Sequence, residues 1–76
     1  MTKLKEMRQK ANMTQNQLAK KTNISIRTLQ SYEQGAKIFD NARIDTIMKI
    51  CLALNCKISD VIENEEYLSL ITKYEN

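Results

Sequence analysis

The chain has 76 residues, with 12 Lys and Arg against 9 Asp and Glu for a formal net charge of +3, and it contains no His, no Pro, no Trp and a single Gly. A chain of this length forms one small domain and leaves little room for a deep substrate pocket beside its core. The absence of His removes the commonest general base and the commonest metal ligand. We therefore expect no catalytic residues, no cofactor and no metal site.

The two cysteines, Cys51 and Cys56, lie five residues apart. Without a His or a second Cys pair, they do not match the ligand spacing of a zinc site. Free Cys behaves as a small buried hydrophobe, so core packing is the simpler interpretation of both. The first ten residues do not resemble an export signal, and no apolar run approaches membrane-spanning length. We expect a cytoplasmic protein with reduced thiols and no membrane partner.

Charge is unevenly distributed along the chain. Residues 1–43 carry nine Lys and Arg against three Asp and Glu, a net charge of +6, whereas residues 44–76 carry three against six, a net charge of −3. A basic half is a candidate footprint for a polyanion, and an acidic half would be repelled by one. A merely solvated surface would have the same composition, so charge alone leaves both interpretations open.

The shortage of Pro and Gly excludes the many tight turns of a β-sandwich or barrel and predicts an all-α fold. Apolar residues at helical spacing predict a first helix over residues 2–12, with Thr2 available as its N-cap. Thr14 and Gln17 have the spacing of a capping box, which predicts a second helix over residues 15–22.

A third helix is predicted between Ser25, which can act as its N-cap, and Gly35, which suits the left-handed position after a helix. About three residues separate it from the second helix, and so short a joint makes the two helices cross steeply, as in a helix-turn-helix. Asn is the residue type that adopts the left-handed conformation most readily apart from Gly. Asn12, Asn23 and Asn55 are therefore predicted to end the other helices.

The remaining chain predicts a polar connection over residues 36–41 and a fourth helix whose apolar positions are Ile44, Ile47, Met48, Cys51 and Leu54. Ser59 is predicted to cap a short fifth helix, from which Val61 and Ile62 return to the core. Residues 63–76 fit an amphipathic helix or an alternating strand, and we favour the helix. The chain thus divides into a five-helix domain over residues 1–63 and an extension over residues 64–76.

The stretch QNQLAKKTNISIRTLQSYEQ, from Gln15 to Gln34 and followed by Gly35, resembles the helix-turn-helix of the Cro/cI-type repressors, or XRE family. The resemblance extends from about Leu4 to Ile62. Its parts occur in order as Thr14-Gln15, Leu18-Ala19, Ile24-Ser25, Tyr32-Glu33-Gln34-Gly35, Leu54-Asn55 and Ile58-Ser59-Asp60. The chain departs from the family in having Asn where Gly is preferred and Thr22 where an apolar residue is usual. The resemblance implies a lambda-repressor-like five-helix domain that binds DNA.

The third helix is the candidate for contacts with DNA bases. In a helix-turn-helix, the second helix lies in the major groove and presents its N-terminal residues to base edges. Arg27 fits guanine O6 and N7, the hydroxyls of Thr28 and Ser31 can bond bases, and Ile26 can pack on a thymine methyl group. An isoleucine exposed by chance is the competing interpretation of Ile26. We predict base contacts from all four residues.

Four other residues are candidates for phosphate contacts. Gln15 begins the second helix, where free backbone N–H groups and the positive end of the helix dipole favour an anion. The resemblance implies a phosphate contact for a glutamine at this position. Gln34, Lys37 and Arg43 lie at or after the end of the third helix and are predicted to contact phosphates as well. Ordinary solvation of these side chains is the alternative.

The resemblance also implies a structural ion pair between Arg8 in the first helix and Glu33 at the end of the third. Such a pair would orient the third helix, and neither residue is expected to contact DNA. Removing one partner of a buried pair strands the other charge, which costs several kcal/mol.

The resemblance and the basic half together predict a sequence-specific DNA-binding transcriptional regulator, acting as a repressor and as a homodimer on a two-fold-related operator in double-stranded DNA. A dimer is expected because one short helix reads only a few base pairs. Residues 64–76 are either the dimerisation element or a segment packed on its own domain. The alternative function is an antitoxin-like or antirepressor-like module whose main partner is another protein; the Arg-containing third helix favours DNA.

Overall fold

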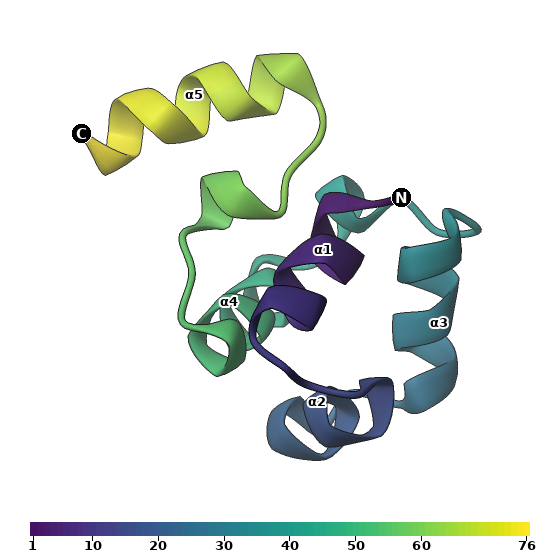
Figure 1. Ribbon diagram of the computed structural model, residues 1–76. Coiled ribbons are helices and arrows are strands. Elements are labelled where there is room, and N and C mark those ends of the chain that lie inside the picture. Colours follow the sequence, from purple (N-terminus) through teal and green to yellow (C-terminus); the bar gives the residue numbers. More distant parts are fainter.

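The computed structural model describes residues 1–76 and contains only helices and the loops between them (Figure 1). The α-helices are α1 (Lys3–Lys10), α2 (Gln15–Thr22), α3 (Ile26–Gln34), α4 (Ile44–Leu54) and α5 (Glu65–Glu75). Two single 3-10 turns complete the secondary structure, η1 (Phe39–Asn41) and η2 (Ile58–Asp60). The all-α prediction is confirmed.

Helices α2 and α3 begin and end at the residues that local signals predict, and α1 covers residues 3–10 of the predicted 2–12. Thr14 Oγ1 accepts a hydrogen bond from the Gln17 N–H at 3.0 Å, and Gln17 Oε1 accepts one from the Thr14 N–H at 2.8 Å, which completes the capping box. Ser25 Oγ accepts from the N–H of the third helical residue at 3.1 Å. The positive φ angles belong to Asn12, Asn23, Asn55 and Gly35, at 57°, 59°, 53° and 83°.

Thr22 holds the turn between α2 and α3. Its side chain is buried, and its hydroxyl donates to the Leu18 carbonyl at 2.7 Å while accepting from the Ile24 N–H at 3.3 Å. A buried hydroxyl that both donates and accepts a hydrogen bond recovers the bonds it loses to water. A threonine therefore fits the position where the family resemblance leads to an apolar residue.

The core gathers residues from α1 to α4, from η1 and from the segment after η2, namely Leu4, Leu18, Leu29, Phe39, Ile47, Ile50, Cys51, Ala53, Leu54, Val61 and Ile62. Phe39 comes from the connection that composition predicts to be polar. Its ring packs edge-on against Tyr32, with the ring centroids 5.2 Å apart and the planes at 75°. This contact ties the segment after α3 to the core.

The prediction of a short fifth helix capped by Ser59 is wrong. Residues 58–60 form one 3-10 turn, and the Ser59 hydroxyl donates to Glu75 Oε1 at 2.7 Å instead of capping a helix. The turn ends because Val61 and Ile62 enter the core, as expected, and the Asp40 carboxylate then accepts from the N–H groups of residues 63 and 64 at 3.0 and 2.9 Å. These bonds lead the chain out into the last helix.

The helix prediction for the C-terminal extension is confirmed, because residues 65–75 form α5. Asn64 Oδ1 accepts from the Tyr67 N–H at 3.0 Å and caps its start. Leu68 and Ile71 pack against the core. Figure 1 shows that α5 lies on the side of the fold away from α2 and α3.

The two thiols lie together at the C-terminal end of α4. The Cys56 N–H donates to the Cys51 carbonyl at 3.0 Å, and the Asn55 N–H donates to the Leu52 carbonyl at 3.3 Å. These two bonds form a Schellman motif, which brings the side chains of Cys51 and Cys56 together. Burial raises the pKa of the Cys51 thiol from its ordinary 9.0 to about 12, and burial also raises the pKa of Cys56.

We expect Cys51 in the folded chain to resist alkylation at neutral pH, because burial keeps the thiol protonated and covered. Its raised pKa also lowers the free energy of unfolding as pH rises from about 9 to about 12, since the unfolded thiol ionises first. Mass spectrometry of the Cys56→Ser variant with iodoacetamide, with and without denaturant, measures the first effect. Labelling of Cys51 at the same rate in both conditions would contradict it.

Candidate DNA interface

The α2–α3 unit has the geometry of a helix-turn-helix. Residues 23–25 join the two helices, which cross steeply in Figure 1. Leu18 of α2 and Leu29 of α3 are both fully buried beneath the unit. Ala19, also on α2, packs against the same core. One side of α3 is thereby fixed to the domain, and the opposite side is free for a ligand.

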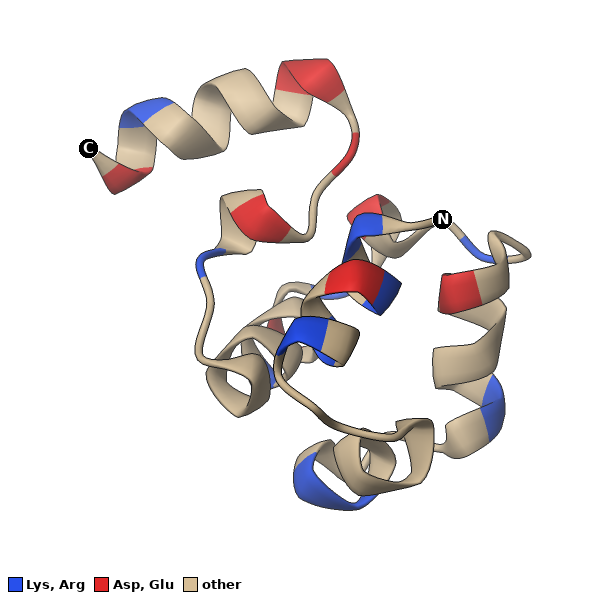
Figure 2. Ribbon diagram, in the orientation of Figure 1, with Lys and Arg blue, Asp and Glu red and all other residues tan.

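Arg27 is the one basic residue of α3, and its side chain is exposed. Figure 2 shows the single blue segment of α3 near the N-terminal end of that helix. The two ion pairs of the structure join Arg8 to Glu33 and Arg43 to Asp45, so the Arg27 guanidinium has no carboxylate partner. All its N–H donors are available to an incoming acceptor. A guanidinium in this state matches the paired acceptors on the major-groove edge of guanine.

The other three predicted base-contact residues, Ile26, Thr28 and Ser31, are half-buried at the same end of α3. Thr28 Oγ1 accepts a hydrogen bond from Ser25 Oγ at 2.9 Å. The Thr28 hydroxyl therefore keeps its own proton for donation to an acceptor. Ile26 is partly accessible, so its side chain contributes apolar surface beside Arg27.

Gln30 is an exposed residue of α3 that the sequence reasoning missed. It follows Arg27 by three residues and precedes Gln34 by four, so these three side chains share one helix face. A carboxamide can bond adenine N6 and N7 through two atoms. The helical spacing of residues 27, 30 and 34 is the sequence signal that could have identified Gln30.

A buried ion pair fixes α3 to α1. Arg8 Nε donates to Glu33 Oε2 at 2.7 Å, and Arg8 Nη2 donates to Glu33 Oε1 at 3.0 Å. The two side chains are 11% and 2% exposed. The hydrogen bond to Glu33 raises the pKa of Arg8 despite the opposing effect of burial. The remaining guanidinium nitrogen, Nη1, donates to the Met13 carbonyl at 2.7 Å, which also holds the loop before α2.

Gln15 joins this network, which sequence reasoning did not anticipate. Its Nε2 donates to Glu33 Oε1 at 3.0 Å, so one carboxylate holds side chains from α1 and α2 at the end of α3. A carboxamide nitrogen carries two protons, and only one is used in this bond. Gln15 thus keeps one N–H for a phosphate while Glu33 fixes the position of its side chain.

The other predicted phosphate-contact residues, Gln34, Lys37 and Arg43, are all exposed. The Lys37 N–H donates to the Ser31 carbonyl at 3.1 Å, which fixes the backbone just after α3. Arg43 Nε lies 3.2 Å from Asp45 Oδ1, and both side chains are open to solvent. An exposed pair of this kind contributes at most about 1 kcal/mol, so Arg43 can exchange it for a phosphate.

The family of the chain follows from a comparison with family models. The model of the Cro/C1-type HTH DNA-binding domain matches residues 3–66. The chain belongs to the Cro/C1-type HTH family. No curated protein and no solved structure matches the chain.

This Cro/C1-type protein is a DNA-binding regulator. Helix α3 is the second helix of its helix-turn-helix. The family match covers α1 to α4, η2 and the first two residues of α5, and leaves residues 67–76 outside it. The acidic residues of the last third of the chain lie on η2, on α5 and on the segment between them, away from α2 and α3 (Figure 2). In addition, no helix has the length and apolar character needed to span a membrane.

Proposed function

We propose that this Cro/C1-type protein is a transcriptional repressor that acts in the cytoplasm as a homodimer on a two-fold-related operator. The observation that carries the proposal is the exposed Arg27 without a carboxylate partner, on a helix whose far end is fixed by the buried Arg8–Glu33 pair. A rigid helix that presents free donors to a groove reads bases with little loss of conformational entropy. Bound protein then represses by excluding other proteins from the same stretch of duplex.

The proposed base contacts come from the N-terminal part of α3. Arg27 bonds a guanine, Gln30 an adenine, and Ile26 packs on a thymine methyl group. The hydroxyls of Thr28 and Ser31 bond base edges or phosphates beside them. The exposure of Arg27 and Gln30 supports direct contacts from both side chains.

The proposed phosphate contacts surround this helix. Gln15 bonds one phosphate at the N-terminus of α2, with its second amide proton held by Glu33. Gln34, Lys37 and Arg43 bond phosphates beyond the C-terminal end of α3. Such contacts position the protein on the duplex without reading its sequence.

Selection of bound sites from random double-stranded DNA tests the function. We expect enrichment of a sequence with two related half-sites, with centres about 34 Å apart along the duplex, because each copy places one α3 in the major groove. The same selection with a variant lacking the donors of α3, Arg27→Ala with Gln30→Ala, is the matched control. Failure of the natural chain to enrich any sequence would contradict the proposal.

A further inference from the structure

Three sulfur-containing side chains line one surface pocket at the C-terminal end of α4. The pocket has a volume of about 290 Å³, and its walls are formed by Met48, Cys51, Leu52, Asn55, Cys56 and Ile58. The chain has two Cys and four Met, so both of its thiols and one of its thioethers meet here. The proposed DNA interface makes no use of this cluster.

Two local features of the chain gather these side chains. Met48 and Cys51 are three residues apart on α4, so they are neighbours on one face of the helix. The Schellman motif at the end of α4 then turns the chain back, so that Cys56 meets Cys51. The end of α4 therefore holds the three side chains together without help from a distant segment.

The pocket gives solvent access to the thiols from one side. Met48 is 49% exposed and Cys56 is half-buried, whereas Cys51 is 6% exposed and lies deepest. Burial is the main cause of the raised pKa of Cys51, and its interaction with the Cys56 thiol, which includes a hydrogen bond, is the next. The two thiol sulfur atoms are thus close enough to share one ligand.

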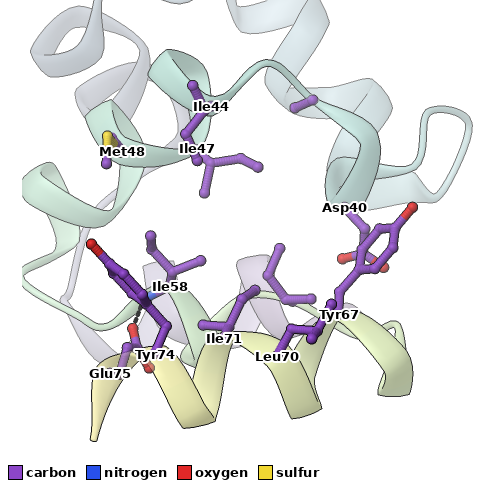
Figure 3. A pocket seen from close by; sticks show the side chains of 12 residues that line it. Asp40, Ile44, Ile47, Met48, Ile58, Tyr67, Leu70, Ile71, Tyr74 and Glu75 are labelled. Carbon is purple, nitrogen blue, oxygen red and sulfur yellow. Dashed lines mark hydrogen bonds between the residues drawn. The ribbon is translucent and has the colours of Figure 1, made fainter.

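The sulfur pocket adjoins the groove of about 690 Å³ that separates α4 from α5. Figure 3 shows Met48 and Ile58 at one end of this groove, the end where Tyr74 and Glu75 also lie. Met48 and Ile58 line both hollows. The thioether of Met48 therefore stands at an open entrance to the thiols.

The carboxylates near the pocket are already bonded to the backbone and to a hydroxyl. Asp60 Oδ2 accepts from the Lys57 N–H at 2.9 Å. The two Glu75 oxygens accept from the Ile58 N–H at 3.1 Å and from the Ser59 hydroxyl at 2.7 Å. No group of three or more His, Cys, Asp or Glu residues is placed to hold a metal ion. The pocket thus lacks the oxygen and nitrogen ligands of a calcium, magnesium or catalytic zinc site, and it offers sulfur.

We propose that Met48, Cys51 and Cys56 bind one Cu(I) ion, with two thiolates and one thioether as its ligands. Soft thiolate and thioether ligands select Cu(I). Cu(I) accepts fewer ligands than a tetrahedral zinc site supplies, so these three sulfur atoms suffice. The sequence expectation of no metal site concerned His and the ligand spacing of zinc, and this site needs neither. The proposal goes beyond the proposed function and does not rest on it.

Binding exchanges protons for the metal ion. Each thiol loses its proton to water, so one Cu(I) ion and two S–H groups give two Cu–S bonds and two free protons. The Met48 thioether has no proton to lose and donates a lone pair, and its flexible side chain can move the sulfur onto the ion. No electron is transferred, so the step requires neither an oxidant nor a reductant.

Titration of the full chain with Cu(I) under anaerobic conditions, in competition with a chromogenic Cu(I) chelator, tests the site. We expect one ion per chain and the ultraviolet charge-transfer band of Cu(I)–thiolate bonds. Cys56→Ser should weaken binding by about 100-fold or more, because loss of a ligand costs more than loss of a group around it. Met48→Leu, which keeps the size and apolar character of the side chain, should weaken binding by about tenfold.

Met7→Leu is the matched control, because Met7 lies on α1 and outside the pocket. It should bind Cu(I) as the natural chain does, and circular dichroism checks that each variant folds. A natural chain that takes no Cu(I) from the chelator overturns the site, as does a Cys56→Ser variant with the natural affinity. Equal affinities of the Met48→Leu and Met7→Leu variants overturn the assignment of the thioether ligand.

Two further measurements test the class of metal. X-ray absorption at the copper edge should show sulfur neighbours alone, and nitrogen or oxygen neighbours would overturn the proposed ligand set. Zinc, titrated in the same way against a zinc chelator, should bind far more weakly than Cu(I), because the pocket supplies no fourth ligand. Zinc bound as tightly as Cu(I) overturns the choice of metal.

Discussion

The Arg27→Ala variant should lose roughly 1–3 kcal/mol of binding free energy at the selected operator and become indifferent to the base pair at one position of each half-site. The reason is that the exposed guanidinium of Arg27 has no carboxylate partner, so the proposed contact with a base is the main interaction that the substitution removes. The denaturant concentration at which the variant unfolds should equal that of the natural chain, because an exposed side chain without such a partner contributes little to stability. Titrations against the operator and its single-base variants, at one salt concentration, measure both effects.

Lys37→Ala is the matched control for this experiment. Lys37 is exposed just beyond α3, and a phosphate contact from it carries no sequence information. We expect weaker binding to all sequences alike, with the slope of log affinity against log salt reduced by about 1. An Arg27→Ala variant with an unchanged selected-site profile would remove α3 from its recognition role.

The Glu33→Ala and Arg8→Ala variants should each lose about 3–5 kcal/mol of unfolding free energy, because each leaves the partner's charge buried and unpaired. Small domains have only about 5–15 kcal/mol in total. Glu33→Ala also removes the acceptor of Gln15, so a second element loses a fixed position. Urea denaturation followed by circular dichroism measures the losses.

The exposed pair of Arg43 and Asp45 provides the control. Both side chains are open to solvent, so Asp45→Ala should change the unfolding free energy by no more than about 1 kcal/mol. A variant with Arg8→Met and Glu33→Leu together should be more stable than either alanine variant, since it buries no charge. Equal losses for the buried and the exposed pair would contradict the structural role of Arg8 and Glu33.

Features that depend on a few neighbouring residues were predictable from the sequence. The capping box of Thr14 and Gln17 needs only residues three apart, and the structure forms it. Asn12 and Asn23 occupy the left-handed conformation because their short polar side chains tolerate it. Such local signals placed α2 and α3 and, with the family resemblance, the candidate interface.

Features that depend on residues far apart in the chain were not predictable in the same way. Ser59 has the residue type of a helix cap, but Glu75 on α5 lies close enough to take its hydroxyl proton. Gln15 was a candidate for phosphate alone, and only the packing of α2 against α3 shows that Glu33 holds it. In both cases the side chain bonds the nearest partner in space, which local sequence does not specify.

The sequence by itself determined that this protein is helical and where its helix-turn-helix lies, because caps, glycine and helical periodicity act over a few residues. Only the tertiary structure decided which apolar side chains of each helix are buried in the core. Ile44 and Met48 have the same spacing and hydrophobicity as the buried residues of α4, yet they are exposed, since the polar contacts at the ends of α5 hold that helix away from them. The open groove between α4 and α5 is the consequence.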